Sequence, residues 1–302
     1  MRTILLWNDD WRMAGPDREL AAPGWRLTRD RWCAPLADAI VFHLPTLDPV
    51  TLPAGRRPGQ RWVGWSMESA ANAPSFADAA FLARFDLTMS HRRDADVWTP
   101  YLPSREELMQ PPVPKTERAT AVYIASNPRD HNGRTAYVAG LMRHLAVDSW
   151  GACLNNRAFA HDEGRATKLA TIARYRFTLA FENACERDYV TEKFFHALST
   201  GSVPVVLGAP EISQYAPDPA AYVDASRYPD PADLAARLAA LAADETAYQA
   251  MLAWKRTGPG PSLASMLDAV AVDPWTRLAR RLADDRDGQG RAGQSRAQRA
   301  GV

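Results

Sequence analysis

A group of charged side chains stands at one predicted helix start, and their types suit a phosphorylated ligand. Glu192 and Lys193 fall in the first turn of a helix that we expect to begin after Thr191. Unpaired backbone N–H groups and the positive end of the helix dipole attract anions there, and Lys193 adds a full positive charge. Glu192 would accept hydrogen bonds from ribose hydroxyls. The alternative is that Glu192 only complements the dipole and Lys193 is solvated.

Two other charged residues occupy comparable positions. Arg134 opens a predicted helix after the polar segment Ser126–Gly133, on the same edge of the sheet as the first group. Glu68 stands at the end of the predicted strand Trp62–Ser66, among residues that can exclude water. The alternatives are a solvated arginine at a helix start and a glutamate that faces solvent.

A strand–loop–helix–strand unit is needed to position the first group, and the sequence predicts one. Phe177–Phe181 and Val203–Leu207 are short apolar runs that fit strands buried on both faces. Thr191 is a good N-cap, and Gly201 stands where a left-handed residue ends a helix. The loop Glu182–Val190 would lie at the carboxyl end of the first strand, where open α/β sheets bind ligands.

Strands and helices alternate along both halves of the chain, which predicts an α/β fold class. In the first half we expect one helix over Ser75–Arg84 and strands at Ile4–Trp7, Ala39–His43, Trp62–Ser66 and Phe85–Met89. In the second half we expect a further strand at Ala119–Ala125 and helices over Arg134–Leu145, Arg165–Tyr175, from Asp230, over Glu245–Lys255 and over Pro274–Ala283.

Clustered prolines at Pro111–Pro114 block both helix and strand pairing, so they predict a linker. A chain of 302 residues fits two α/β domains. We therefore expect an N-terminal domain over residues 1–112 and a C-terminal domain over 113–283. Residues 284–302 have almost no large apolar side chain and predict a disordered tail. Its scattered arginines would give at most a weak contact with an anionic membrane surface.

Charge and cysteine content exclude several classes of protein. The formal charge is +1 and no basic stripe is visible, so we expect no nucleic-acid partner. Cys33, Cys153 and Cys185 cannot all pair and lack the spacing of a zinc or redox site, which favours a cytoplasmic location. The apolar start turns polar at Asn8, too early for a signal peptide or a membrane span, so we expect a soluble protein. The sequence contains no Walker loop, nucleophile elbow or dinucleotide glycine motif.

Several segments between residues 60 and 210 together resemble one enzyme family. The donor-site signature is carried by Phe181-Glu-Asn183, Asp188-Tyr-Val-Thr-Glu-Lys193 and Gly201-Ser-Val-Pro-Val-Val-Leu-Gly208. Ser126-Asn127 followed by Arg134, and Val147-Asp-Ser-Trp-Gly-Ala-Cys153, come in the same order as in that family. The chain thus resembles the α-1,3/1,4-fucosyltransferases, glycosyltransferase family 10, in their soluble bacterial type.

This resemblance implies a fold and a reaction. The fold would be two facing Rossmann-like domains of the GT-B type, with the active site in the cleft between them. The donor would be GDP-fucose, and inversion at the anomeric carbon would give an α-fucoside. The acceptor would be an oligosaccharide or a glycolipid, held mainly by the first domain, with O3 of an N-acetylglucosamine unit as the attacking hydroxyl. No cofactor or metal would be required.

The resemblance also assigns roles to individual residues. Positive groups at the diphosphate would stabilise the charge that develops as the bond to GDP breaks, which makes Lys193 and Arg134 catalytic as well as donor-binding. Glu68 would be the general base. The remaining donor-binding positions would be Asn183, Tyr189 and Glu192, with Glu192 at the ribose.

Departures from the family pattern keep alternatives open. Ala70 replaces a proline after Glu68-Ser69, and His91 replaces a tyrosine before Arg92-Arg93. Asp94-Ala-Asp96 is a literal Asp-x-Asp, which holds a metal in another glycosyltransferase fold, and Asp94 is a reserve candidate for the base. The alternatives are a transferase for another nucleotide-deoxysugar and a non-catalytic protein that binds a sugar nucleotide or a glycan.

Overall fold

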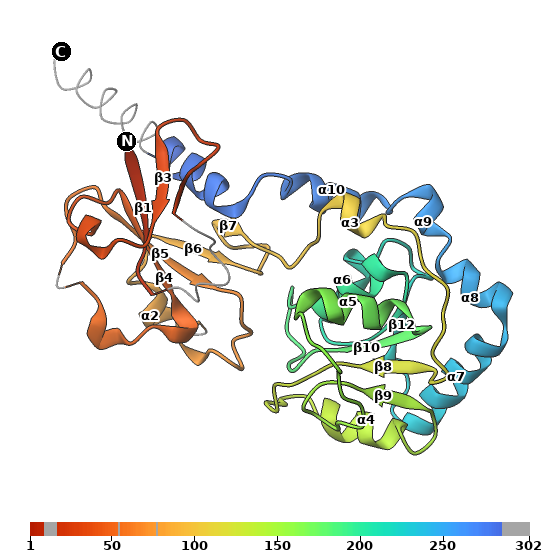
Figure 1. Cartoon of the computed structure of the whole chain (residues 1–302). Helices are drawn as coiled ribbons and strands as arrows, with labels where there is room; N and C mark the ends of the chain where they lie inside the picture. The colour runs from red at the N-terminus through yellow and green to blue at the C-terminus, as the bar shows by residue number, and fades with distance from the viewer. Residues whose placement is uncertain (9–16, 54, 77, 286–302) are drawn as a thin grey trace, which may run out of the picture. The chain divides into compact units, whose positions relative to one another are not determined.

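The structure is a computed structural model that describes residues 1–8, 17–53, 55–76 and 78–285. The chain forms two compact units (Figure 1): unit 1 comprises Met1–Thr99 with Val272–Val302, and unit 2 comprises Pro100–Ala271. Each unit contains one sheet of mainly parallel strands joined by helical connections. The predicted α/β fold class is therefore confirmed.

The sheet of unit 1 has the spatial order β2-β3-β1-β4-β5-β6-β7, and β2 alone among these strands runs antiparallel to its neighbour. Four of its strands were predicted, whereas β2, β3 and β7 were missed because they are too short to show a pattern. The strands are β1 (Arg2–Leu6), β2 (Arg18–Glu19), β3 (Trp25–Thr28), β4 (Ala39–His43), β5 (Arg61–Ser66), β6 (Leu87–Ser90) and β7 (Val97–Trp98).

The helical connections of unit 1 are short. The helix expected over Ser75–Arg84 is a 3-10 turn at Pro74–Phe76 and the α-helix α2 (Ala79–Leu82). Asp78, and not Ser75, caps α2, since its carboxylate accepts hydrogen bonds from the N–H groups of Ala80 and Phe81. The further 3-10 turns are Arg31–Cys33, Leu44–Thr46 and Pro49–Thr51.

Unit 2 is a parallel sheet with helices on both faces. Its spatial order is β12-β11-β10-β8-β9. The strands are β8 (Ala121–Tyr123), β9 (Val147–Ser149), β10 (Phe177–Phe181), β11 (Val203–Leu207) and β12 (Val223–Asp224). The helices are α3 (Arg105–Leu108), α4 (Arg134–Leu141), α5 (Arg165–Ala173), α6 (Glu192–Thr200), α7 (Pro231–Ala243), α8 (Glu245–Met251), α9 (Trp254–Thr257) and α10 (Pro261–Ala269), with 3-10 turns at Ile212–Gln214 and Ala225–Arg227.

The core of unit 2 explains why its central strands read as continuous apolar runs. One face of the sheet packs against α4, α7 and α8 through a cluster that includes Phe177, Val205 and Leu234. The other face packs Val122 against Ile172 of α5. A strand covered on both faces has no solvent-facing positions, so β10 and β11 have the predicted bounds.

Both predicted ends of α6 are confirmed. Thr191 caps the first turn by accepting a hydrogen bond from the N–H of Lys193, and Gly201 ends the helix in the left-handed conformation with φ 68°. Two expectations nearby were less accurate, because the helix expected over Glu245–Lys255 is broken into α8 and α9, and α10 was missed.

The units divide at Thr99 and Pro100 and not at the proline cluster, so the expected boundary after residue 112 is corrected. Prolines prevent regular pairing but not packing, and Pro112 lies directly against Gly201 of unit 2. Lys115 donates a hydrogen bond from Nζ to the carbonyl oxygen of Ala173 at 2.7 Å. The proline cluster is therefore a packed part of unit 2.

The last described helix, over residues 274–285, belongs to unit 1, although we assigned it to the second domain. Trp275 packs edge-on against Trp65 of β5, with ring centroids 5.1 Å apart. Arg277 donates a hydrogen bond to the carbonyl oxygen of Trp98 at 2.6 Å. The expected disordered tail and its arginines, from Arg286 onward, lie outside the described residues.

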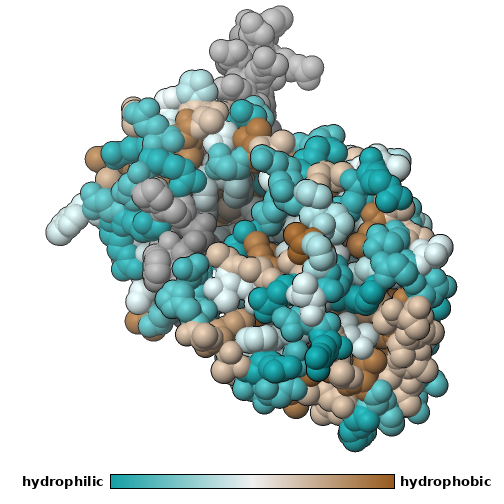
Figure 2. Space-filling model, turned by 45° about the vertical axis from the view of Figure 1, so that its right-hand side comes forward, coloured by the Kyte–Doolittle hydropathy of each residue, from teal (hydrophilic) through white to brown (hydrophobic). Residues whose placement is uncertain are grey.

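Hydrophilic residues cover most of the face shown in Figure 2, with hydrophobic residues in small groups between them. None of the helices in the described ranges is long and apolar enough to cross a membrane.

We predict that Gly201→Ala destabilises the protein by about 2–4 kcal/mol. A Cβ at this position would lie 2.4 Å from Cβ of Pro112, and the backbone φ is one that L-residues avoid. Gly133→Ala is the matched control, because Gly133 is also left-handed, with φ 76°, but faces open space. It should cost only about 1 kcal/mol. Urea unfolding of both variants measures the difference, and equal losses would contradict close packing of the proline cluster.

Candidate functional site

The candidate site lies at the point in the sheet of unit 2 where the strand order reverses. From β8 the chain proceeds outward to β9, whereas from β10 it proceeds the other way to β11 and β12. The loops after β8 and β10 therefore diverge at their carboxyl ends and leave the crevice in which open α/β sheets bind ligands. Two hydrogen bonds join them, from the N–H of His131 to the carbonyl oxygen of Asn183 (2.9 Å) and from Nδ2 of Asn132 to that of Glu182 (3.0 Å).

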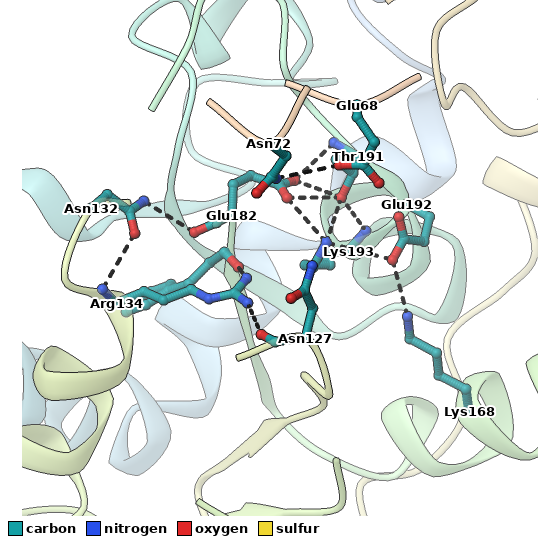
Figure 3. A network of polar contacts seen from close by, with 11 residues as sticks. Glu68, Asn72, Asn127, Asn132, Arg134, Lys168, Glu182, Thr191, Glu192 and Lys193 are labelled. Carbon is teal, nitrogen blue, oxygen red and sulfur yellow. Dashed lines mark hydrogen bonds and ion pairs between the residues drawn. The ribbon is translucent and has the colours of Figure 1, made fainter. Parts of the chain in front are cut away.

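The start of α6 is organised by a buried carboxylate that the sequence analysis did not assign. Glu182 follows β10 directly and is only 3% exposed. Its carboxylate accepts hydrogen bonds from the N–H of Thr191 (2.8 Å), from the hydroxyl of Thr191 (2.7 Å) and from Nζ of Lys193 (3.1 Å), as Figure 3 shows. The carboxylate therefore ties the end of β10 to the first turn of α6.

Lys193 is held at the helix start and is not solvated. Besides the bond to Glu182, its Nζ donates to the hydroxyl oxygen of Thr191 at 3.0 Å, and a carboxylate oxygen of Glu192 lies 3.6 Å away. Burial on its own would lower the pKa of Lys193, but the carboxylates of Glu182 and Glu192 raise it above its ordinary value. The residue therefore carries a positive charge at neutral pH.

Glu192 remains partly accessible, with about a third of its side chain exposed. Nζ of Lys168, from α5, donates a hydrogen bond to its Oε1 at 3.3 Å. Burial on its own would raise the pKa of Glu192, but the charges of Lys193 and Lys168 lower it to about 2. Glu192 is therefore an ionised acceptor that can receive hydrogen bonds from ligand hydroxyls.

Arg134 lies on the other side of the crevice, but its guanidinium is turned inward. The residue is 1% exposed, and its two terminal nitrogens donate to the carbonyl oxygens of Phe181 (3.0 Å) and Asn127 (2.8 Å). Its Nε is buried and has no hydrogen-bond partner among the described residues. Arg134 thus joins the loop after β8 to the end of strand β10 (Figure 3), so the alternative of a solvated arginine is wrong.

Asn183 and Tyr189 are both buried in the loop after β10. Oδ1 of Asn183 has no hydrogen-bond partner within the described part of the chain, which fits an acceptor that a ligand would satisfy. Tyr189 follows Asp188, whose backbone is left-handed with φ 62°. Tyr215 donates a hydrogen bond from its hydroxyl to Asp188 at 2.8 Å, and Glu211 accepts one from the Asp188 N–H. These contacts fix the loop that carries Tyr189.

In unit 1, Glu68 follows β5 as expected and is half-buried. Nδ2 of Asn72 donates a hydrogen bond to its carboxylate at 3.3 Å (Figure 3). This bond orients the carboxylate from within the loop in which Ala70 replaces the family's proline.

The Asp-x-Asp pattern has a structural explanation. Asp96 accepts hydrogen bonds from the N–H (2.8 Å) and the hydroxyl (3.0 Å) of Thr88, which ties the segment before β7 to β6. Asp94 is exposed and forms a two-pronged ion pair with Arg92 at 2.8 and 3.0 Å. Among the described residues, no group of three or more His, Cys, Asp and Glu side chains is placed to hold a metal ion.

The structure therefore brings together five of the six predicted site residues in unit 2 and places Glu68 in unit 1. Sequence reasoning missed Glu182 and Lys168. It also missed that the Thr191 hydroxyl, besides capping α6, binds Glu182 and Lys193. The sequence did contain a signal for Glu182. It stands within the motif Phe181-Glu-Asn183, directly after a fully buried strand, where a carboxylate needs hydrogen-bond donors.

Family models match nearly the whole chain. A model described as "Fucosyltransferase, N-terminal" matches residues 1–102, and one described as "Glycosyltransferase family 10 (fucosyltransferase) C-term" matches residues 114–290.

Curated relatives come from a plant and from mammals. A fucosyltransferase-like protein of Arabidopsis thaliana is 39% identical over 74% of this chain, and the match spans 43% of that protein's length. The 4-galactosyl-N-acetylglucosaminide 3-alpha-L-fucosyltransferase of Pan troglodytes is 35% identical, over 84% of this chain and 73% of its own. Alpha-(1,3)-fucosyltransferase 7 of Rattus norvegicus is 35% identical, over 84% and 69%.

Solved structures support the fold alone. The crystal structure of an alpha1,3-fucosyltransferase with GDP-fucose has a TM-score of 0.60 at 16% identity, over 83% of this chain and 81% of the other. A DNA-modifying beta-glucosyltransferase has a TM-score of 0.51 at 10% identity, over 93% and 99%. These matches, with the two mainly parallel sheets, identify the GT-B fold.

Proposed function

The chain belongs to the fucosyltransferases of glycosyltransferase family 10, and from that membership we propose what its residues do in the reaction. It is an α-1,3/1,4-fucosyltransferase that takes fucose from GDP-fucose. The observation that carries the assignment of roles is the partly buried, charged Lys193 at the start of α6, beside the point where the strand order of unit 2 reverses.

The diphosphate of GDP-fucose binds at the start of α6. An ammonium group has three N–H bonds, and Lys193 gives two of them to Glu182 and Thr191. No third hydrogen bond of Nζ is present among the residues described, although a carboxylate oxygen of Glu192 lies 3.6 Å away, and we assign this N–H to a diphosphate oxygen. As the bond from the anomeric carbon to the diphosphate breaks, negative charge grows on GDP, and a fixed cation in a water-poor site stabilises it.

Two acceptor groups serve the rest of the donor. Glu192, ionised and partly exposed, accepts hydrogen bonds from the ribose hydroxyls. Oδ1 of Asn183 accepts a hydrogen bond from another part of GDP-fucose. The buried guanidinium of Arg134 contributes its positive charge from the other side of the crevice, and Tyr189 completes the donor-binding loop. These roles are consistent with a site that uses protein cations in place of a metal.

Glu68 is the general base of the proposed reaction. The acceptor hydroxyl oxygen forms a bond to the anomeric carbon of fucose from the face opposite GDP, and the carbon–oxygen bond to the diphosphate breaks with its electron pair. The hydroxyl proton passes to the Glu68 carboxylate, which Asn72 orients. One attack from the opposite face inverts the anomeric centre and gives the α-fucoside.

The acceptor hydroxyl of the proposed reaction is O3 of an N-acetylglucosamine unit in an oligosaccharide or glycolipid. The names of the Pan troglodytes and Rattus norvegicus relatives specify 3-linked products, although a 35% identical relative from Pongo pygmaeus is named for 4-linked ones. A cytoplasmic location is part of the proposal, supported by free thiols at Cys33, Cys153 and Cys185.

We predict that Lys193→Ala loses both donor affinity and turnover. Removing one charge-assisted hydrogen bond to the diphosphate should weaken GDP-fucose binding by at least about tenfold and reduce kcat further. Calorimetric titration with GDP-fucose, GDP-mannose and a UDP-sugar measures the affinity and its selectivity. Arg237→Ala, which removes an exposed charge elsewhere in unit 2, is the control. Unchanged binding in Lys193→Ala would refute the donor site.

We predict that Glu68→Gln keeps donor affinity and loses about 10²–10⁴-fold in kcat, because only proton removal is affected. Asp94→Asn, which removes an exposed carboxylate of the same unit, should stay near wild-type activity. If Glu68→Gln kept full activity and Asp94→Asn lost kcat, the general base would be Asp94 and not Glu68. The measurement is initial-rate kinetics beside calorimetric titration of GDP-fucose.

We predict transfer to O3 of N-acetylglucosamine in an N-acetyllactosamine acceptor, at a rate that excess EDTA does not change. Linkage analysis of the purified product identifies the hydroxyl. Transfer to O4, tested with the isomeric acceptor that carries galactose on O3, would correct the linkage. A loss of rate in EDTA that Mg²⁺ or Mn²⁺ restores would overturn the proposal of a metal-independent site.

A further inference from the structure

We propose that Glu182 is a positioning residue that keeps the side chain of Lys193 charged and aimed at the donor crevice. This inference rests on the proposed function of Lys193. It concerns a carboxylate that does not touch the reacting atoms.

Glu182 is fixed in place by contacts on every side. Its backbone N–H donates to the carbonyl oxygen of Leu207 at 2.8 Å, and its own carbonyl oxygen receives Nδ2 of Asn132. A Cβ at Gly208 would lie 3.0 Å from Cγ of Glu182, so the neighbouring strand end leaves room for this side chain. Because burying a carboxylate is costly unless hydrogen-bond donors surround it, the bonds from Thr191 and Lys193 offset the cost of burying this side chain.

The same bonds set the direction of Lys193. Glu182 and Thr191 take two N–H bonds of the ammonium on its protein side. The tetrahedral geometry of the ammonium then determines the direction of the third. A lysine without Glu182 would keep the hydrogen bond to the Thr191 hydroxyl and the 3.6 Å ion pair with Glu192, and these hold a flexible side chain less firmly.

Several other groups influence the charge of Lys193. Burial and the positive charge of Arg134, on α4, lower the pKa of Lys193, whereas Glu182 and Glu192 raise it. On α6 itself, burial and the charge of Lys168 lower the pKa of His196 to about 4, so His196 is neutral at neutral pH. Burial raises the pKa of Tyr123 of β8, which keeps it neutral too.

Replacing the Glu182 carboxylate with a neutral amide would therefore leave Lys193 with one attractive charge, that of Glu192, against burial and Arg134. The variant lysine should lose its proton at a lower pH than in the wild type. Below that pH the site stays charged, and above it the diphosphate loses its cation.

The test is the pH dependence of kcat/KM for GDP-fucose between about pH 6.5 and 10 in Glu182→Gln. We expect modest loss near pH 7 and a steep alkaline fall, up to tenfold per pH unit, at a lower pH than in the wild type. A purely structural role would lower the whole profile without moving its alkaline limb. Glu107→Gln, which removes a partly exposed carboxylate paired with Arg165, should keep the wild-type profile.

A second substitution identifies the titrating group. Arginine keeps its charge throughout this range, so adding Lys193→Arg to Glu182→Gln should remove the alkaline fall. If the fall persists, a group other than Lys193 causes it, and the proposal is overturned. An alkaline limb that does not move in Glu182→Gln overturns it as well.

The outcome separates this inference from the proposed function. If Lys193→Ala binds and turns over GDP-fucose like the wild type, the proposed function of Lys193 fails first. If Lys193→Ala is impaired but Glu182→Gln has the wild-type pH profile, only the role of Glu182 fails. Should Glu182→Gln not fold, Glu182→Asp replaces it: the shorter carboxylate should also move the alkaline limb to lower pH, and an unmoved limb overturns the proposal.

Discussion

A carboxylate enclosed by protein needs hydrogen-bond donors around it, and the proposed donor site of this fucosyltransferase is built around one such carboxylate. Glu182 is the first residue after the central strand β10, and its partners Thr191 and Lys193 are the cap and first turn of α6. One side chain thereby fixes the strand end, the helix start and the cation. The eight residues between Glu182 and Thr191, Asn183–Val190, then form a loop whose two ends are already joined.

The rest of the site follows from this junction. Glu192 lies between Lys168 and Lys193 and remains ionised although it is partly enclosed. Asn183, next to Glu182, uses its carbonyl oxygen to bind the N–H of His131 in the loop after β8. The two loops of the crevice are therefore connected through Glu182 and Asn183, the two residues that follow β10.

Sequence reasoning succeeded where a single local force decides the structure. β10 and β11 are buried on both faces, so their apolar runs have sharp ends, and Thr191 and Gly201 are capping residues with few alternatives. It failed where distant contacts decide. The proline cluster packs because Gly201, far along the chain, leaves space for Pro112. Arg134 is buried because two carbonyl oxygens, of Asn127 and of Phe181 at the end of β10, accept its hydrogen bonds. The family motif located the site residues, but their partners became visible only in the fold.

The guanidinium of Arg134 has a further consequence for the crevice. Its two terminal nitrogens are held at a fixed separation by a rigid, delocalised plane, and they donate to carbonyl oxygens of the loop after β8 (Asn127) and of the end of β10 (Phe181). The distance between the loop after β8 and the end of β10 is therefore set in part by the covalent geometry of one guanidinium group. The two sides of the crevice are thus tied together before any ligand binds, and such preorganisation lowers the entropy cost of binding.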